Sequence, residues 1–242
     1  MPFELDSKES LDYHYRLIRS KRYLKNIYTD YYNRFKKSLA SHKIIIEIGS
    51  GAGFIKEVIP KVLTSDVLPG KGIDCVFSAT KIPFKNGEVS AFVMIDVLHH
   101  IKSPQRAIHE MDRCLTKRGK IIMIEPANSL MGRFIFQHFH HEKFAPDAGW
   151  NIKGEGRLSD ANGAIPYIIF IRDRIIFEKK FPNLRIQNIK FHTPLRYITS
   201  GGLSKPQLLP SFTYPVILAV EWLLSPLNKY LGLFMTVEIE KI

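Results

Sequence analysis

A short apolar strand runs directly into a glycine-rich turn near position 50, and this junction carries the residues best suited to chemistry. The segment reads Ile44-Ile-Ile-Glu-Ile-Gly-Ser-Gly-Ala-Gly53. Glycine has no Cβ, so Gly49, Gly51 and Gly53 let the backbone turn tightly and approach a ligand closely. Glu47 stands two residues before the first glycine, where its carboxylate would repel a pyrophosphate. The junction therefore predicts a nucleotide-type cofactor that carries a positive charge.

Further segments follow the turn in a regular order. They are Val62-Leu-Thr-Ser-Asp66, Ala79-Thr-Lys-Ile-Pro-Phe84, Ala91-Phe-Val-Met-Ile-Asp-Val-Leu-His-His-Ile101, and Arg113-Cys-Leu-Thr-Lys-Arg-Gly119 before Lys120-Ile-Ile-Met-Ile-Glu-Pro126. In this order they resemble the class I S-adenosylmethionine-dependent methyltransferases of the Methyltransferase-11-like group. The resemblance implies a methyltransferase with S-adenosylmethionine as cofactor. It also implies an α/β fold, a Rossmann-like, doubly wound sheet of seven strands, mostly parallel with an antiparallel C-terminal hairpin.

The resemblance also implies how the cofactor is held. The glycine turn, Ser50 included, brings backbone against the methionine part, and Glu47 supports its ammonium group. Asp66 is expected to take both ribose hydroxyls, because a carboxylate offers two acceptor oxygens to two adjacent donors.

The adenine and methyl ends of the cofactor are assigned in the same way. Ser78 stands where the family usually has an acid for the adenine edge, so Asp74 or the backbone of Ala79 is expected to share that role. Asp96 and Val97 follow the fourth strand and are expected to line the pocket near the transferred methyl group.

A hydroxyl acceptor would need a base, because its proton must leave as the methyl group arrives. His99 and His100 follow the fourth strand, and a neutral imidazole suits this task near pH 7. We favour His100, and the alternative is a purely structural histidine. His141, with Glu142 beside it, is the second choice. Glu125, at the end of the fifth strand, is expected to orient the acceptor or seal the pocket.

A metal site is the other reading of the histidine-rich segment after the fifth strand. The segment contains His138, His140, His141 and Glu142. It has no partner cysteines or paired carboxylates that would complete a metal site. We therefore expect no metal ion.

The chain is organised as one methyltransferase domain over residues 1–242. Apolar strands alternate with helical segments up to Pro126, which predicts a parallel sheet. The strands are expected at 44–48, 62–66, 73–77, 91–95 and 120–125, with a final hairpin from 181–190 and 234–241. The segments are a basic helical start (1–40), a cofactor-binding core (41–126), an insertion that shapes the acceptor pocket (127–180) and a C-terminal hairpin with an apolar segment between its strands (181–242).

Charge and apolar patterning suggest partners. The net charge is +12, and many of its basic residues mix with tyrosines before the first strand, which would suit RNA, an anionic membrane or a phosphorylated substrate. The alternative is a solvated helix whose aromatic residues, Tyr28, Tyr31, Tyr32 and Phe35, pack over the core.

The apolar stretch 216–225 is too short to span a bilayer. It predicts either a helix packed on the sheet or an exposed face with Trp222 at a membrane surface.

The acceptor is inferred from two further segments. Phe139-His-His-Glu-Lys-Phe-Ala-Pro-Asp-Ala-Gly-Trp150 and Ser200-Gly-Gly-Leu-Ser204 resemble a short subgroup associated with bacterial cell-surface polysaccharide and lipid-linked saccharide pathways. We expect O-methylation of a sugar or of a small or lipid-linked glycan by a cytoplasmic enzyme that can lie on the inner membrane face.

Two alternatives remain at this stage. A tRNA or rRNA methyltransferase would use the basic N-terminal segment, but the chain lacks an Asn/Asp-Pro-Pro-Tyr-type base-clamping motif. A non-catalytic scaffold subunit would not need a ribose carboxylate such as Asp66. The sequence leaves the oligomeric state open.

Overall fold

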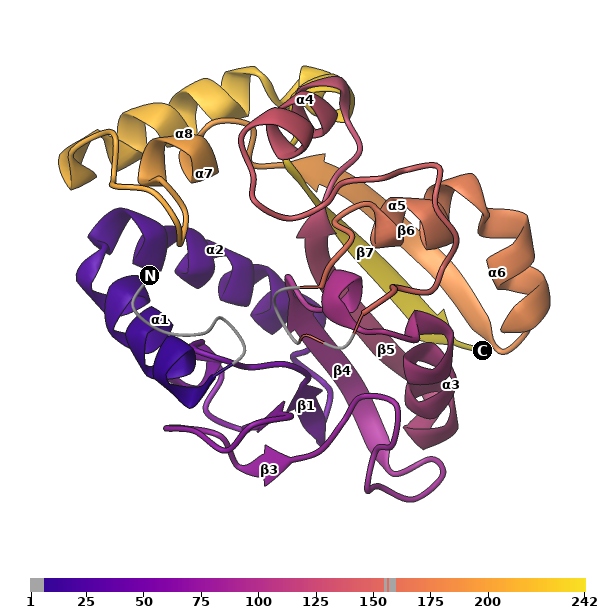
Figure 1. Ribbon diagram of the computed structural model, residues 1–242. Coiled ribbons are helices and arrows are strands. Elements are labelled where there is room, and N and C mark those ends of the chain that lie inside the picture. Colours follow the sequence, from indigo (N-terminus) through magenta and orange to yellow (C-terminus); the bar gives the residue numbers. More distant parts are fainter. Residues whose placement is uncertain (1–6, 155, 157–159) are drawn as a thin grey trace.

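A seven-stranded sheet runs through the computed structural model, which describes residues 7–154, 156 and 160–242 (Figure 1). Its strand order is β3-β2-β1-β4-β5-β7-β6. The strands are β1 (Ile45–Glu47), β2 (Val62–Asp66), β3 (Cys75–Val76), β4 (Val89–Ile95), β5 (Leu115–Pro126), β6 (Leu184–His192) and β7 (Phe234–Lys241). The first five strands pair in parallel, and β7 lies antiparallel between β5 and β6. This confirms the predicted Rossmann-like sheet and its antiparallel C-terminal hairpin.

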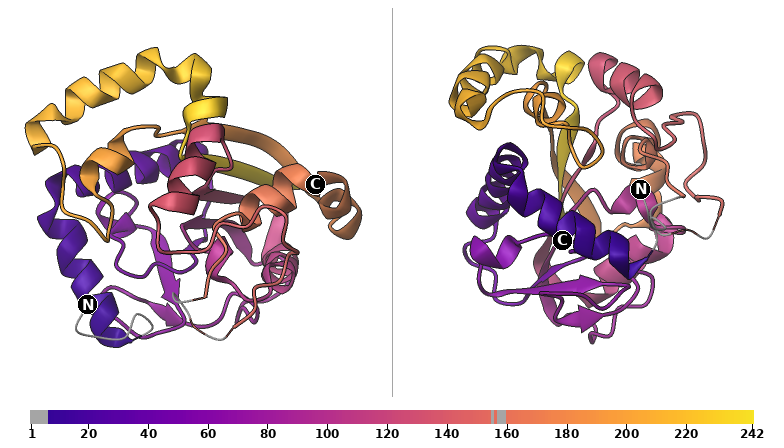
Figure 2. Two further views of the ribbon diagram at one scale, coloured as in Figure 1. Left: turned by 45° about the horizontal axis from the view of Figure 1, so that its top comes forward. Right: turned by 60° about the vertical axis from the view of Figure 1, so that its left-hand side comes forward.

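Helices cover both faces of the sheet, which explains the unbroken apolar runs of its central strands. Figures 1 and 2 place α1 and α2 on one face and α3 and α6 on the other. Their bounds are α1 (Lys8–Ser20), α2 (Arg22–Ser38), α3 (Pro104–Cys114) and α6 (Arg174–Lys180). In β4 and β5, the side chains of residues 91–94 and 121–124 are buried. Residues 67–74 link β2 to β3 without a helix.

The aromatic stripe before the first strand is part of the core. Tyr28, Tyr31, Tyr32 and Phe35 lie on α2 and are buried, so the packing interpretation of their helical spacing is confirmed. These rings are not displayed on the surface as a stacking platform for nucleic acid.

The insertion after β5 folds back onto the carboxyl end of β4. It begins with α4 (Leu130–His138) and continues through α5 (Ile165–Tyr167) and the π-helical turn η3 (Ile168–Arg172) into α6. The backbone N–H of Ile152 donates to the carbonyl of Lys102 over 3.1 Å, and that of Asn162 donates to the carbonyl of His99 over 3.0 Å. These bonds bring the histidine-rich segment to the edge of the sheet where a ligand is expected.

The segment between β6 and β7 forms an outer helical layer, seen in yellow and orange in Figure 2. Its elements are α7 (Arg196–Ser200), η4 (Ser211–Thr213), α8 (Tyr214–Leu223), η5 (Ser225–Leu227) and α9 (Asn228–Leu231). Among the described residues, no helix has the length and apolar character needed to cross a bilayer.

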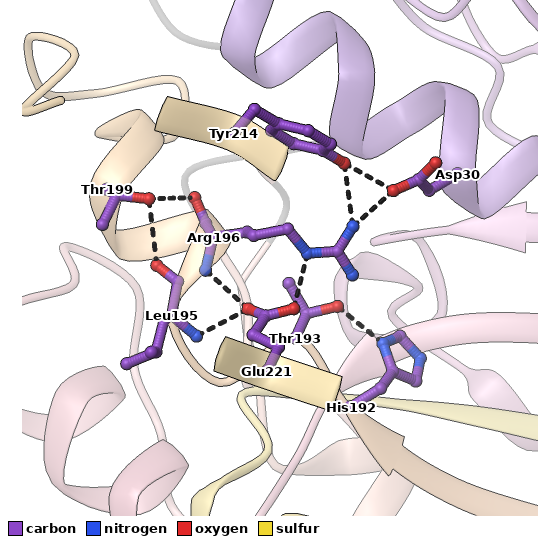
Figure 3. Close-up of polar contacts among 8 residues, drawn as sticks. All are labelled: Asp30, His192, Thr193, Leu195, Arg196, Thr199, Tyr214 and Glu221. Atoms are coloured by element: carbon purple, nitrogen blue, oxygen red, sulfur yellow. Dashed lines mark hydrogen bonds and ion pairs between the residues drawn. The ribbon is translucent and has the colours of Figure 1, made fainter. Parts of the chain in front are cut away.

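A buried arginine fastens α8 to the body of the protein (Figure 3). Arg196 Nε donates to Glu221 Oε2 over 2.5 Å, and its guanidinium also contacts Asp30 of α2 and the Tyr214 hydroxyl. Glu221 Oε1 accepts the backbone N–H groups of Leu195 and Arg196 over 2.8 and 2.7 Å. Removing either buried charge would leave the other without its partner, at a cost of about 3–5 kcal/mol.

This network turns the polar side of α8 inward. Glu221 is only 6% exposed, whereas Trp222 and Leu223 are 74% and 69% exposed. The expectation of a helix whose apolar face packs on the sheet is therefore wrong. The Arg196 network, rather than apolar contact, holds α8 in place and leaves most of its large apolar side chains in solvent.

Candidate active site

A cavity of about 580 Å³ lies at the carboxyl ends of β1, β2 and β4. Ligands of open α/β sheets bind at this edge. Apart from Asp74, all the predicted cofactor residues line the cavity: Glu47, Gly49, Ser50, Gly51, Gly53, Asp66, Ser78, Ala79, Asp96 and Val97. Residues of α1, α2, the insertion and the loop after α7 complete the wall. All four sequence segments therefore contribute to one site.

The three glycines of the turn are required by backbone conformation or by close contacts. Gly49 and Gly51 have φ values of 63° and 48°, a conformation that favours glycine. A Cβ on Gly49 would lie 2.7 Å from the Val97 side chain, and one on Gly53 would lie 2.7 Å from the Tyr32 hydroxyl. The turn therefore brings backbone directly to the cavity wall.

Asp66 is held rigidly beside this turn. Its Oδ2 accepts the Gly51 N–H over 2.9 Å, and its Oδ1 accepts the Leu68 N–H over 3.1 Å. Each carboxylate oxygen keeps acceptor capacity beyond these single bonds. The buried carboxylate can therefore receive the two adjacent hydroxyls of a ribose, as the sequence predicts.

Two buried carboxyl groups beside the turn, at the ends of β1 and β4, each have an oxygen without a hydrogen-bond partner among the described residues. Within the described structure, Glu47 Oε2 and Asp96 Oδ1 are buried and have no hydrogen-bond partner. Burial raises the pKa of each carboxyl to about 8, and the nearby Glu125 and Glu142 carboxylates contribute at Asp96, against the opposing effect of His99. Asp96 also has a φ of 55°, which is uncommon for a residue with a Cβ. An ammonium group such as that of S-adenosylmethionine would donate to both oxygens. Its single positive charge would restore the charge of Glu47, whereas Asp96 would accept through its neutral carboxyl group.

The adenine end is less polar than expected. Ser78 Oγ lies 2.9 Å from Thr80 Oγ1, and both residues line the cavity beside Phe77. Asp74 does not line it, because its carboxylate binds Lys56 Nζ at 2.5 Å and the Thr64 N–H at 2.9 Å. The proposed sharing of the adenine contact by Asp74 is therefore wrong.

A histidine–carboxylate cluster lies across the cavity from the turn. His99 Nδ1 is 2.6 Å from Glu125 Oε2, and His99 Nε2 is 3.3 Å from Glu142 Oε2. His100 Nε2 and His141 Nε2 each lie 3.6 Å from Glu142 Oε1. The predicted catalytic residues His99, His100 and His141 thus meet around Glu142.

Glu125 does not reach the acceptor side. It is fully buried behind His99 and accepts the backbone N–H groups of Val97 and Leu98 over 3.0 and 2.7 Å. It is not part of the cavity wall. Its expected role against the acceptor is corrected to that of a positioning residue for His99.

The two carboxylates stabilise positive charge at His99. Burial alone would lower the pKa of His99, but Glu125 and Glu142 outweigh it and hold this pKa well above its usual value. Burial likewise opposes ionisation of Glu142, yet His99 and the other histidines lower its pKa to about 2. The two carboxylates therefore favour the charged form of His99 as long as no other cation binds its Nε2.

Sequence reasoning missed the contribution of the N-terminal helices to the cavity. Leu11, His14 and Ile18 of α1, with Tyr28 and Tyr32 of α2, line the wall beside the glycine turn. Helical spacing placed the tyrosines in an apolar stripe. Helical spacing does not distinguish residues of the stripe that pack on the sheet from residues that face a ligand.

The comparisons with known proteins agree with this geometry. Residues 46–123 match the family model described as Methyltransferase domain, whereas no curated protein matches the chain. A methyltransferase structure from Thermotoga maritima superposes with a TM-score of 0.56 at 14% identity, covering 94% of this chain and 93% of its own. One from Archaeoglobus fulgidus gives 0.54 at 14% identity, covering 90% and 94%. These likenesses at low identity show the fold. Residues 46–123 are thus similar to a methyltransferase domain, and the chain has the Rossmann-like fold of S-adenosylmethionine-dependent methyltransferases.

Proposed function

We propose that this methyltransferase acts on a hydroxyl group of a sugar or of a lipid-linked saccharide. The observation that carries the proposal is the cluster of His99, His100, His141 and Glu142 in the cofactor cavity. A hydroxyl is a weak nucleophile until its proton leaves, so its methylation needs groups that promote that loss. A cluster of imidazoles and a carboxylate supplies such groups.

The reaction is an in-line displacement at the sulfonium methyl group. The oxygen–carbon bond forms as the carbon–sulfur bond breaks, and the electron pair of the broken bond stays on sulfur. The products are a methyl ether, S-adenosylhomocysteine and one proton. The protein contributes mainly by aligning the two centres and excluding water, so it needs no nucleophile of its own.

The rest of the cavity wall suits a polar acceptor. His14, Lys102 and Asp160 line it in addition to the cluster, so donors and acceptors face the cavity from several sides. Saccharide hydroxyls both donate and accept hydrogen bonds, and such mixed surroundings would satisfy them. The likeness of residues 139–150 to the saccharide-linked subgroup points the same way.

Transfer of label from methyl-labelled S-adenosylmethionine tests the acceptor class. Saccharides, lipid-linked saccharides, tRNA and small amines are each incubated with wild-type protein and with the Asp66→Asn variant as inactive control. We expect alkali-stable label in a saccharide fraction with wild type alone, because a methyl ether resists hydrolysis. Label confined to RNA or to amines would overturn the proposal.

We further propose that the enzyme works at an anionic membrane surface. Large exposed apolar side chains gather on α4, α8 and the segments beside them, and α4 packs against α9. We call this set the apolar surface: Leu130, Phe134, Phe139, Leu208, Phe212, Val216, Trp222, Leu223, Leu227 and Tyr230. Such a surface would enter the headgroup region without crossing the bilayer.

The charges around the apolar surface are complementary to anionic lipids. Between residues 206 and 233 the one acidic residue is Glu221, which is buried. The cations Arg133, Lys205 and Lys229 are exposed in α4, in the loop before α8 and in α9. Each exposed cation close to an anionic leaflet contributes about 1 kcal/mol of attraction.

Vesicle binding tests this second proposal. We expect wild-type protein to cosediment with phosphatidylglycerol-containing vesicles, and the Trp222→Ser/Leu223→Ser variant to bind at least about tenfold more weakly, because two large side chains no longer enter the bilayer. The matched control is Ile175→Ser/Ile176→Ser, which removes two exposed apolar residues of α6. Equal binding by both variants, or a stable dimer that buries Trp222, would contradict membrane attachment.

A further inference from the structure

Three side chains of the cluster have the spacing of ligands that share one ion. His99, His100 and Glu142 each offer one possible ligand atom, and these three atoms lie within 4.8 Å of one another. The Glu142 carboxylate is 3.3 Å from His99 Nε2 and 3.6 Å from His100 Nε2. A separation of 3.6 Å is too long for a hydrogen bond. Two ligands that each bind a tetrahedral ion at about 2.1 Å lie about 3.4 Å apart, and Glu142 presents Oε2 to His99 and Oε1 to His100 at separations close to this value.

His99 has the hydrogen-bond partner that metal-binding histidines usually have, a carboxylate on the second ring nitrogen. Its Nδ1 pairs with Glu125 Oε2 at 2.6 Å, which turns Nε2 toward the cavity. Glu125 is itself fixed by two backbone N–H groups. Metal-binding histidines usually donate their second ring N–H to a carboxylate in this way.

The neighbouring histidines differ from these three residues. His140 Nδ1 already accepts the backbone N–H of Glu142, and His141 is about half exposed. His138 sits on α4 with Nδ1 2.8 Å from the carbonyl of Phe134. None of them belongs to this three-residue group. A second group of possible ligands among the described residues, Asp96, His99 and Glu125, shares His99, but Glu125 is already bound to two backbone N–H groups.

We propose that His99, His100 and Glu142 bind one divalent transition-metal cation, with a further coordination position open to the acceptor oxygen. Two histidines and one glutamate with an open position form a known ligand set of catalytic zinc. The proposal deepens the proposed function, on which its use of the acceptor oxygen rests. It revises two expectations from the sequence, that no metal is bound and that His100 is a base.

The cation would promote the loss of the hydroxyl proton. An oxygen bound to a divalent cation would have a strongly lowered pKa, so its proton would pass more readily to His141 of the cluster as the methyl group arrives. The oxygen–carbon bond would form as the carbon–sulfur bond breaks, with no change of oxidation state. His99, His100 and Glu142 would hold the ion and would not themselves carry the proton away.

Cobalt binding tests the site without S-adenosylmethionine or any acceptor. The metal-stripped full-length protein is titrated with Co²⁺, and visible absorption and calorimetry are recorded. We expect one tight site per chain with the intense bands of a four-coordinate ion and, by X-ray absorption, histidine ligands. Glu142→Gln and His100→Ala are expected to weaken binding at least about 100-fold, more than loss of a supporting residue.

His138→Ala is the matched control, because it removes a nearby histidine outside the ligand set. It is expected to bind Co²⁺ as wild type does. Failure of wild type to bind Co²⁺, Zn²⁺ or Mn²⁺ would overturn the proposal, as would unchanged binding in folded Glu142→Gln. Since the readout needs no methyl transfer, a protein that binds the ion but methylates no saccharide would contradict the proposed function and leave the metal site intact.

Discussion

Replacement of Asp66 by asparagine is expected to weaken S-adenosylmethionine binding at least about 100-fold, because two hydrogen bonds to a charged acceptor contribute about 1.5–3 kcal/mol each. Asparagine offers one acceptor oxygen and one NH₂ group, so it cannot receive both ribose hydroxyls. Its NH₂ group would also face a backbone N–H, since both carboxylate oxygens of Asp66 accept one. Isothermal titration of wild type and variant measures the loss.

Asp74→Asn is the control for this effect. Asp74 lies directly before β3 and accepts the N–H of Thr64 in β2, but its carboxylate pairs with Lys56 outside the cavity. We expect its affinity for S-adenosylmethionine to stay within about twofold of wild type, since no cofactor contact is lost. Equal losses in both variants would show a general effect of this sheet edge and contradict the ribose assignment.

Binding of S-adenosylmethionine is expected to tighten with pH by about tenfold per unit between pH 6.0 and 7.5, because it releases one proton. The source is Glu47, whose pKa burial raises to about 8, so that it is protonated in the free protein over this range. The ammonium of the ligand, with a pKa of about 7.7–8.0, remains charged there and pairs with the ionised carboxylate. Titration in buffers of different ionisation enthalpy counts the released proton.

Glu47→Gln separates this linkage from other pH effects. The amide has the same shape and cannot ionise, so the affinity of the variant should be low and almost independent of pH. S-adenosylhomocysteine carries the same amino-acid group and should show the same slope with wild type. A wild-type affinity that falls or stays constant as pH rises would contradict the assignment of the ammonium to Glu47.

The same group affects the stability of the free protein in the opposite direction. The folded pKa of Glu47 is raised, so the folded state binds more protons than the unfolded chain between about pH 4.5 and 8. Its contribution to stability is therefore full below pH 4.5 and is lost as pH rises through 8. The thermal shift produced by S-adenosylmethionine should grow over the range in which the free protein weakens.

The cofactor half of the site could be predicted because its determinants are local. The turn from Gly49 to Gly53 and the position of Asp66 depend on a strand, a tight turn and the end of the next strand. Each of these three features can be recognised from residue types and their spacing. The parallel register of β1 with β2 then brings Asp66 beside Gly51 without any further information.

The acceptor half could not be predicted, because it depends on long-range folding of the insertion. Glu142 meets His99 and His100 only when residues 139–152 and 160–164 return to the end of β4, and no periodic pattern specifies that path. The pairing of Glu142 with His99 and His100 likewise has no signal in the sequence that could inform the expectation about a metal ion. The exposure of the apolar residues of α8 could likewise not be predicted, because the buried position of Glu221 depends on Arg196, which lies 25 residues away in the chain.

A crystal structure of the protein with S-adenosylhomocysteine tests the central claim most directly. We predict the ribose hydroxyls on Asp66, the ammonium on Glu47 and Asp96, and the sulfur facing His100 and Glu142 across a space that can hold the acceptor oxygen. A ligand bound elsewhere, or one whose sulfur faces away from the histidine–carboxylate cluster, would contradict the account of methyl transfer at this site.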